Sequence, residues 1–329
     1  MATVADASTV HGEGDPGPDL GPAVFGTMTF GTQTPEAEAR GMVELCREAG
    51  ITMFDTANMY GDGLSEEILG RAVAPFRDDV LIATKVGNRH DLPAGVPQLT
   101  AKAIREEVEA SLRRLKTDRI DLYYLHMPDH STPIEETLEA FQALVEAGKI
   151  LAIGQSNFAA WQAMEMLHIA DREGWSPVTY AQPMYNLLAR RPEEEYAAFA
   201  ARYRMRNIVF NPLAGGLLTG KYRIGDVPNP GSRFTRASYQ RRYWSSEHFA
   251  AVEEFRTIAA DAGLTLIELA LRWVDAQPLV HRVLLGASRL EHLEANLTAL
   301  EGPPPDEETS RRVDEVWQRL RGAAPGYNR

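Results

Sequence analysis

The stretch Ile51–Gly70, ITMFDTANMYGDGLSEEILG, holds the pattern that decides the fold. A short apolar run ends at the acid Asp55, a loop of turn-forming residues carries Tyr60, and apolar residues spaced by three and four begin at Leu64. A strand, a polar strand end and a helix, in this order, are the unit of a parallel sheet whose faces are covered by helices. The rest of the chain repeats this unit.

Other apolar runs end in polar residues in the same way: PAVFGTMTFG, VLIATK, IDLYYLH, ILAIGQS, PVTYAQP, NIVFNP and RVLLGAS. With PAVFGTMTFG as the first strand, the count of strands reaches eight. Amphipathic segments between the strands predict helices at residues 35–49, 64–74, 101–115, 133–147, 160–173 and 193–203. This order predicts either an open doubly wound sheet or a closed eight-stranded barrel.

Two features favour the barrel. The strands continue without a break into halves, and no G-x-G-x-x-G follows the first strand to hold a pyrophosphate. We therefore expect an α/β fold, a (β/α)8 TIM barrel, with an active site at the C-terminal ends of its strands and an extended loop, residues 225–248, after strand seven. This single domain is expected to span residues 22–329. Residues 1–21 lack a hydrophobic period and are expected to form a mobile leader.

Composition narrows the classes of partner. The chain has 329 residues, with 34 Lys and Arg against 46 Asp and Glu and a formal net charge of −12. Such an acidic surface argues against nucleic acid or an anionic membrane as the main partner. Neither a long apolar run nor a secretory signal occurs, so a cytoplasmic protein is expected. The single Cys46 excludes disulfides within the chain, and the sequence leaves a homo-oligomer open.

The polar residues that end the runs are the candidate functional residues. They are Asp55, Lys85, His126, Ser156 with Asn157, Gln182, Asn211 and Ser288, with Tyr60 on the loop after the second strand. Any one of them alone is more often a structural or solvated residue. No cluster of His or carboxylates with metal-ligand spacing lies at the strand ends, so no metal is expected and a metal-dependent hydrolase or sugar-binding barrel is disfavoured.

Together, four of these residues suit the reduction of a carbonyl group. A phenol is a poor acid at neutral pH, with a reference pKa of about 10. A neighbouring ammonium such as Lys85 favours the phenolate of Tyr60, and Asp55 would keep that ammonium charged and oriented. His126 beside the phenol can hydrogen-bond the same substrate oxygen. The carbonyl oxygen could then gain a proton as hydride arrives at the carbon.

The segments FDTANMYGDGLSEEILG, LIATKVG, IDLYYLHMPD and IGQSNF resemble, in order and spacing, the signatures of the aldo-keto reductase family. The resemblance runs from about Val24 to the C-terminus. It implies that Tyr60 is the general acid, that Lys85 and Asp55 tune it, and that His126 orients the carbonyl. The fold implied by the resemblance is the (β/α)8 barrel.

The resemblance also implies a nicotinamide cofactor, NADP(H), bound without a Rossmann domain. The cofactor-binding positions that it implies are Ser156, Asn157, Gln182, Phe210, Asn211, Leu213, Gly215, Lys221, Gly286, Ser288, Arg289, His292 and Asn296. Preference for NADP over NAD rests on Ser288 and Arg289, since a guanidinium matches phosphate geometry. The chain departs from the commoner pattern with His292 in place of Gln or Arg and Ala295 in place of Glu.

Further segments, among them QPMYNLLAR and NPLAGGLLTGKY, look most like the family's aflatoxin-aldehyde and succinic-semialdehyde reductase branch. Small, aromatic, dicarbonyl or carboxylated aldehydes are the substrates that this likeness implies. Met59, Arg242, Trp244 and Arg329 are the expected substrate residues. The arginines of residues 225–248 could instead face solvent or bind cofactor phosphates. The open alternatives are a regulatory subunit like the potassium-channel beta subunits and a ketone or sugar reductase of a biosynthetic pathway, and turnover must decide among them.

Overall fold

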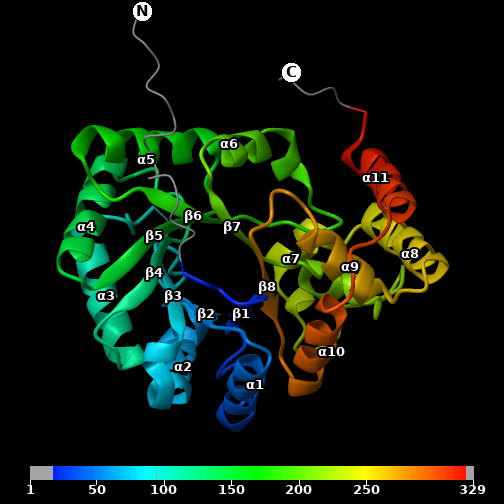
Figure 1. Ribbon diagram of the computed structural model, residues 1–329, viewed down its shortest axis with the longest axis horizontal. Coiled ribbons are helices and arrows are strands. Elements are labelled where there is room, and N and C mark those ends of the chain that lie inside the picture. Colours follow the sequence, from blue (N-terminus) through cyan, green and yellow to red (C-terminus); the bar gives the residue numbers. More distant parts are fainter. Residues whose placement is uncertain (1–17, 94, 324–329) are drawn as a thin grey trace, which may run out of the picture.

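The computed structural model describes residues 18–93 and 95–323, and their strands close into a barrel in chain order, β1 to β8 (Figure 1). Every neighbouring pair of strands is parallel. The strands are β1 Val24–Gly26, β2 Met53–Asp55, β3 Leu81–Val86, β4 Ile120–Leu125, β5 Ile150–Ser156, β6 Val178–Gln182, β7 Arg206–Val209 and β8 Arg282–Gly286. The predicted (β/α)8 barrel is confirmed.

The strands are buried on both faces. Val24, Met53 and Ile208 belong to a core inside the barrel, whereas Phe25 and Phe54, one residue further along their strands, belong to the core beneath the helices. Successive strand side chains point to opposite faces, so a strand between two cores needs a continuous apolar run. This is why the strands read as unbroken apolar runs.

The helices surround the barrel (Figure 1). They are α1 Glu36–Glu48, α2 Leu64–Val73, α3 Ala101–Leu115, α4 Ile134–Glu146, α5 Ala160–Glu173, α6 Tyr196–Arg202, α7 Ala237–Tyr243, α8 Ser246–Asp261, α9 Leu266–Asp275, α10 Leu290–Leu300 and α11 Glu307–Arg321. Helices α1 to α5 match their predicted bounds closely. The prediction of one helix over residues 193–203 was wrong, because the backbone of Glu195 (φ −145°) separates the 3-10 turn η4, Arg191–Glu194, from α6. In the described part of the chain, no helix is both long enough and apolar enough to cross a membrane.

The N-terminal end of the barrel is closed by Leu20, which is 2% exposed and packs in the inner core. Its neighbours are anchored, because the Thr52 hydroxyl donates to Asp19 O (2.8 Å) and Arg282 Nε donates to Gly21 O (2.6 Å). Residues 19–21 are therefore part of the barrel domain rather than of the expected leader. Residues 1–17 of the expected leader lie outside the described residues.

The chain after β7 is folded into short elements: η5 Ala214–Thr219, η6 Arg233–Thr235 and α7. The ring of Trp244 packs against Tyr222, Phe234 and Phe249, with centroid distances of 5.0, 4.7 and 5.1 Å. This aromatic cluster gives the extended loop its own small core. Gln33 Nε2 donates to Gly231 O (2.5 Å), which joins the loop after β1 to the loop after β7.

The close approach of α2 to α3 requires a glycine. An ideal Cβ on Gly70 would lie 2.4 Å from the backbone oxygen of Leu115, so Gly70→Ala is expected to destabilise the fold by up to about 3 kcal/mol. Gly41, in the middle of α1, has only ordinary contacts at 3.9 Å. Gly41→Ala is therefore expected to stabilise by about 0.5–1 kcal/mol. Urea unfolding of both variants checks this, and a Gly70→Ala protein as stable as the parent would contradict the packing.

Candidate functional site

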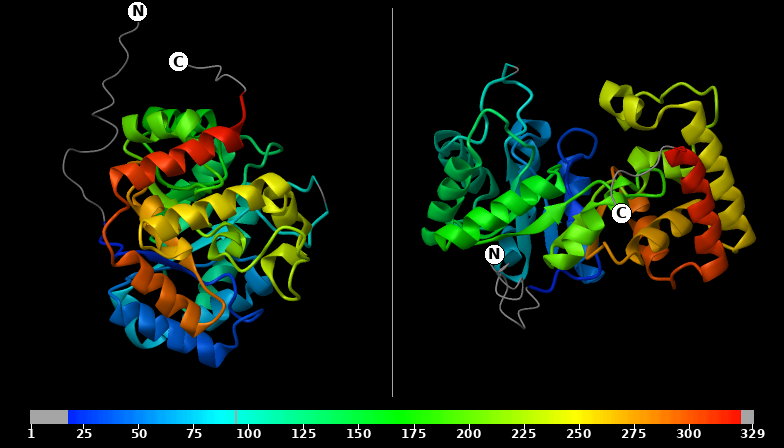
Figure 2. Two further views of the ribbon diagram at one scale, coloured as in Figure 1. Left: turned by 90° about the vertical axis from the view of Figure 1, so that its right-hand side faces the viewer. Right: turned by 90° about the horizontal axis from the view of Figure 1, so that it is seen from above.

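A cavity of about 910 Å³ lies at the C-terminal ends of the strands. The loops after β1, β3 and β7 project from one side of the barrel (Figure 2, right). The cavity is lined by most of the predicted site residues: Asp55, Tyr60, His126, Ser156, Asn157, Gln182, Phe210, Asn211, Leu213, Gly215, Lys221, Gly286, Ser288, Arg289, His292 and Asn296. Lys85 is fully buried beneath the cavity.

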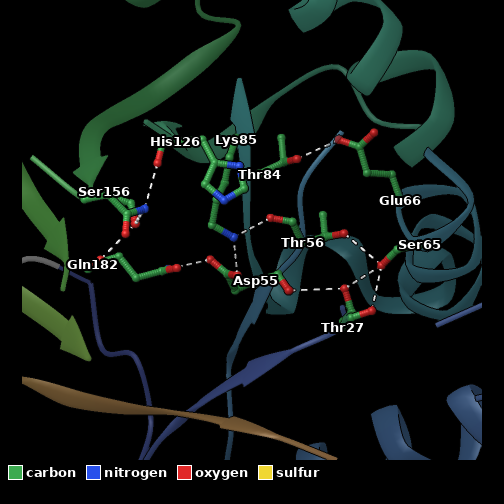
Figure 3. A network of polar contacts seen from close by, with 11 residues as sticks. Thr27, Asp55, Thr56, Ser65, Glu66, Thr84, Lys85, His126, Ser156 and Gln182 are labelled. Atoms are coloured by element: carbon green, nitrogen blue, oxygen red, sulfur yellow. Dashed lines mark hydrogen bonds and ion pairs between the residues drawn. The ribbon is translucent and has the colours of Figure 1, made fainter. Parts of the chain in front are cut away.

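A buried ion pair lies at the centre of the site (Figure 3). The Lys85 ammonium contacts Asp55 Oδ1 and donates to Thr56 O (2.7 Å). Gln182 Nε2 donates to the other carboxylate oxygen, Asp55 Oδ2 (2.8 Å). Strands β2, β3 and β6 contribute Asp55, Lys85 and Gln182, so the closed barrel brings these side chains to one point.

Tyr60 begins a tight turn, η2 Tyr60–Gly63, in which Gly61, Asp62 and Gly63 all have positive φ. Glycine adopts such a backbone without the steric cost that other residues meet, which explains the turn-forming residues after Tyr60. The turn places the Tyr60 ring centroid 5.1 Å from Lys85 Nζ. The ring meets the imidazole of His126 edge to face, at 6.1 Å between centroids and 84° between planes.

Burial and neighbouring charges shift the pKa values of Tyr60 and Lys85 in opposite directions. Burial raises the pKa of the Tyr60 phenol above its usual value, and the Lys85 charge is the largest influence that lowers it. The net direction is upward, so the phenol keeps its proton at neutral pH. Burial alone would lower the pKa of Lys85, but Asp55 and Tyr60 raise it above its usual value. The lysine is therefore charged at neutral pH.

His126 lies at the end of β4 and is nearly buried. Burial, together with the charge of Lys85, holds the pKa of His126 well below its usual value. The imidazole is consequently neutral at physiological pH. Its Nδ1 atom is buried without a hydrogen-bond partner among the described residues. A neutral ring of this kind can hydrogen-bond a polar group in the cavity without adding a charge.

Polar side chains at the end of β5 are held in place by backbone carbonyl groups at the ends of the neighbouring strands β4 and β6. The Ser156 hydroxyl donates to Gln182 O (2.9 Å), and Asn157 Nδ2 donates to His126 O (2.9 Å). Asn157 has a positive φ of 68°, a conformation that Asn tolerates better than most residues. These side chains are fixed before any ligand binds.

The segment after β7 forms a concave backbone surface on another side of the cavity. Positive φ occurs at Asn211, Ala214, Gly215 and Gly216, and the Asn211 side chain accepts a hydrogen bond from Gly215 N (2.6 Å). Lys221 Nζ lies 3.6 Å from the position that a Cβ on Gly216 would take. The Lys221 ammonium has no ion pair within the described ranges. An anion is the group that suits this concave surface.

The segment from β8 into α10 lines the remaining end of the cavity. The Thr34 hydroxyl donates to Ser288 O (3.1 Å), and Leu290 N donates to the carboxylate of Glu38 (3.0 Å). One amide of the first turn of α10 is therefore already occupied by a protein carboxylate. The side chain of Arg289 is 67% exposed and lies 3.9 Å from Glu291, so its charge remains accessible.

Three predicted substrate residues do not line the cavity: Met59, Arg242 and Trp244. The wall position expected for Trp244 is not observed, because its ring is packed in the aromatic cluster of the loop after β7. Arg242 is exposed, with its guanidinium 5.7 Å from the Tyr239 ring centroid. Arg329 lies outside the described residues.

Other lining residues are not among the predicted site residues, chiefly Met28, Thr29, Thr32 and Gln33 after β1 and Tyr239 after β7. Arg233, one of the arginines of residues 225–248 for which the sequence left several roles open, also lines the cavity. PAVFGTMTFG was predicted to be a strand throughout, but β1 ends at Gly26. The rule that loops after barrel strands line the site could have found the first group. No local pattern distinguishes Arg233 and Tyr239 from the other polar residues of their long loop.

A model of the Aldo/keto reductase family matches residues 22–318. Aflatoxin B1 aldehyde reductase member 2 of Rattus norvegicus is 36% identical over 324 residues, which cover 93% of this chain and 87% of that protein. Aldo-keto reductase family 7 member A3 of Homo sapiens is 36% identical over 324 residues, covering 93% and 96% of the two chains. A probable voltage-gated potassium channel subunit beta of Arabidopsis thaliana is 35% identical over 286 residues, covering 84% and 86%. The chain therefore belongs to the aldo/keto reductase family of oxidoreductases.

Proposed function

We propose that this protein reduces aldehydes to alcohols with NADPH, and that Tyr60 is the general acid. The observation that carries the proposal is the placement of Tyr60 and His126 in one cavity above the buried pair of Lys85 and Asp55. A protonated phenol beside a neutral imidazole offers two hydrogen-bond donors, the phenol O–H and an imidazole N–H, to one carbonyl oxygen. The carbonyl oxygen would lie between them.

Negative charge develops on the carbonyl oxygen as hydride arrives at the carbon, and the reaction therefore requires a proton donor at that oxygen. Tyr60 donates that proton, and the Lys85 ammonium stabilises the phenolate that remains. Asp55 keeps the ammonium charged and fixed, with Gln182 bound to its other oxygen. When bound, a reduced nicotinamide supplies the hydride that the carbonyl carbon receives.

The lining of the cavity fits a nicotinamide dinucleotide. Ser156, Asn157 and Gln182 are polar side chains near the reacting groups and suit a carboxamide. Gly215 and Gly216, with Lys221 beside them, suit the pyrophosphate, because positive φ turns backbone amides toward a common anion. Ser288 and Arg289 are exposed enough to bind a 2′-phosphate, which favours NADPH over NADH.

Aldehydes are proposed as the substrates because relatives named aflatoxin B1 aldehyde reductase are 36% identical over 93–95% of this chain. Carboxylated aldehydes remain in the proposed class of substrates. The arginine of the loop after β7 that we propose to meet their carboxylate is Arg233, which lines the cavity, and not Arg242, which does not.

A second candidate function is a regulatory subunit, since a relative named as a potassium channel subunit beta is similarly close. Turnover separates the two. We expect NADPH absorbance to fall with aromatic aldehydes and succinic semialdehyde, and more slowly with ketones and sugars. Tight NADPH binding without turnover of any carbonyl compound would favour the regulatory subunit instead.

Replacing Tyr60 tests the proposed acid. Tyr60→Phe keeps the packing of the ring but removes the proton donor, so we expect the reduction rate to fall by about 10² to 10⁴. NADPH binding, followed by fluorescence, should be unchanged because the phenol is not part of the proposed nucleotide contacts. A Phe variant with the parent rate would show that Tyr60 is not the acid.

Replacing Lys85 tests the charge beside the phenol. The Lys85 charge lowers the pKa of Tyr60, so Lys85→Met should raise that pKa. Reduction needs the protonated phenol and declines as pH rises through its pKa. In the variant this high-pH decline should move to higher pH, with a much lower maximal rate because the phenol is a weaker acid.

A control is needed for the Lys85 variant because it leaves the buried Asp55 carboxylate without its partner, which destabilises proteins strongly. Lys85→Met combined with Asp55→Asn removes both charges. The double variant should be more stable than Lys85→Met and equally slow in reduction. A pH profile that neither variant changes would remove the lysine from the mechanism.

Replacing Arg289 tests the cofactor preference. Arg289→Ala removes a charge offered to the 2′-phosphate, and we expect NADPH affinity to fall by roughly tenfold, given the exposure of the side chain. NADH affinity should hardly change because NADH lacks this phosphate. Titration calorimetry with both cofactors measures the two affinities. Equal losses would show that Arg289 does not read the phosphate.

A further inference from the structure

Behind the reacting groups lies a buried cluster of three hydroxyl groups, from Thr27, Thr56 and Ser65 (Figure 3). Ser65 is the second residue of α2, and Thr27 and Thr56 directly follow β1 and β2. The Ser65 hydroxyl donates to Thr27 O (2.8 Å), and it lies 2.9 Å from the Thr27 hydroxyl and 3.0 Å from the Thr56 hydroxyl. The cluster therefore joins the first turn of α2 to two strand ends.

The proton positions in this cluster follow from counting donors. Each hydroxyl has one proton and can accept two hydrogen bonds. The Ser65 proton is directed to Thr27 O, so the Thr56 hydroxyl donates to Ser65 Oγ. The Thr27 hydroxyl lies within reach of two acceptors, Asp55 O (3.1 Å) and Ser65 Oγ (2.9 Å). Ser65 is thus the acceptor for the Thr56 hydroxyl.

The cluster is connected to Lys85 by the backbone carbonyl of Thr56. Lys85 Nζ donates to Thr56 O (2.7 Å), and it also contacts Asp55 and Tyr60. The direction of the Thr56 carbonyl depends on the backbone of Thr56, whose side chain is held by Ser65. Ser65 does not act as a helix cap, because α2 has Gly63 as its N-cap and no side-chain cap bond.

A neighbouring contact fixes α2 against β3. Glu66 is fully buried, accepts from the Thr84 hydroxyl (2.6 Å) and accepts from Arg114 Nε (2.5 Å). Thr84 precedes Lys85 in β3, and consecutive strand side chains point to opposite faces. The first turn of α2 is consequently fixed to the strands that carry both Asp55 and Lys85.

We propose that Ser65 is a positioning residue for this reaction: its hydroxyl holds Thr56, whose carbonyl holds the Lys85 ammonium beside Tyr60. The inference rests on the proposed role of Tyr60 as the acid. The charged and titratable groups that face the Tyr60 phenol are Lys85 on β3, Asp55 on β2, Tyr239 on α7 and His126 after β4. Of these, the Lys85 charge is the one that lowers the pKa of Tyr60. Ser65 is connected to the Lys85 ammonium through Thr56.

The test compares Ser65→Ala with Thr137→Val. Thr137 is a buried hydroxyl in the first turn of α4 that donates to Leu99 O (2.8 Å) and does not line the cavity. We expect Ser65→Ala to lower kcat by roughly tenfold to a hundredfold, because a small displacement of reacting groups has that effect. The high-pH decline of kcat should move to higher pH, while NADPH affinity stays within about twofold. Thr137→Val should lower Tm without changing the pH profile.

A double-mutant cycle with Thr56→Val tests whether Ser65 acts on Lys85 through Thr56. Thr56→Val should lower kcat as Ser65→Ala does, and the combined variant should be no slower than either one, because both remove the same hydrogen bond. Additive losses of kcat in the combined variant would overturn the proposal. So would a Ser65→Ala protein that has the pH profile of the parent and a Tm lowered as in Thr137→Val. The Tyr60→Phe variant separates the two claims: an inactive Tyr60→Phe protein with an unchanged Ser65→Ala profile refutes only the role of Ser65.

Discussion

The ion pair of Lys85 and Asp55 is the interaction on which the rest of the site depends. Both side chains are buried, and a charge without a partner in such a place would cost several kcal/mol. Each charge is met by a second polar group, Thr56 O for the ammonium and Gln182 Nε2 for the carboxylate. With these hydrogen bonds made, the ion pair holds the positive charge of Lys85 near the Tyr60 ring, and that charge stays shielded from solvent.

The barrel supplies the geometry that this pair requires. Adjacent parallel strands place residues from β2 and β3 side by side, and closure of the sheet brings Gln182 of β6 to the same point. The turn that carries Tyr60 then depends on glycines at 61 and 63, and α2 begins directly after it. Through Ser65 and Glu66, this helix is bonded to the loop after β2 and to β3, so the reacting groups have support from both strands and helix.

The fold was predictable from sequence because the two sides of each strand are both apolar. Burial on both faces produces unbroken runs such as VLIATK, and the polar residue at the end of each run marks the face where the site forms. That rule places His126 at the cavity and Lys85 beneath it, and Tyr60 lines the same cavity from the turn after β2. Their roles in the reaction remain proposals.

What sequence reasoning missed depends on contacts between distant segments. Leu20 was assigned to a leader because residues around it are polar and rich in Gly and Pro, yet it fills the end of the barrel. Trp244 is expected at the cavity, but its ring packs instead against the rings of Tyr222, Phe234 and Phe249. Arg233 and Tyr239 line the cavity through the path of a long loop, which local periodicity does not encode.

The central claim is that a carbonyl oxygen is bound between Tyr60 and His126 above a charged Lys85. A crystal structure of the protein with NADP⁺ and an unreactive carbonyl inhibitor tests it most directly. The account predicts the carbonyl oxygen within about 3 Å of both the Tyr60 hydroxyl and the His126 imidazole, with Lys85 still bonded to Asp55. An inhibitor whose oxygen contacts neither residue, or a nicotinamide bound away from Gln182, would contradict the account.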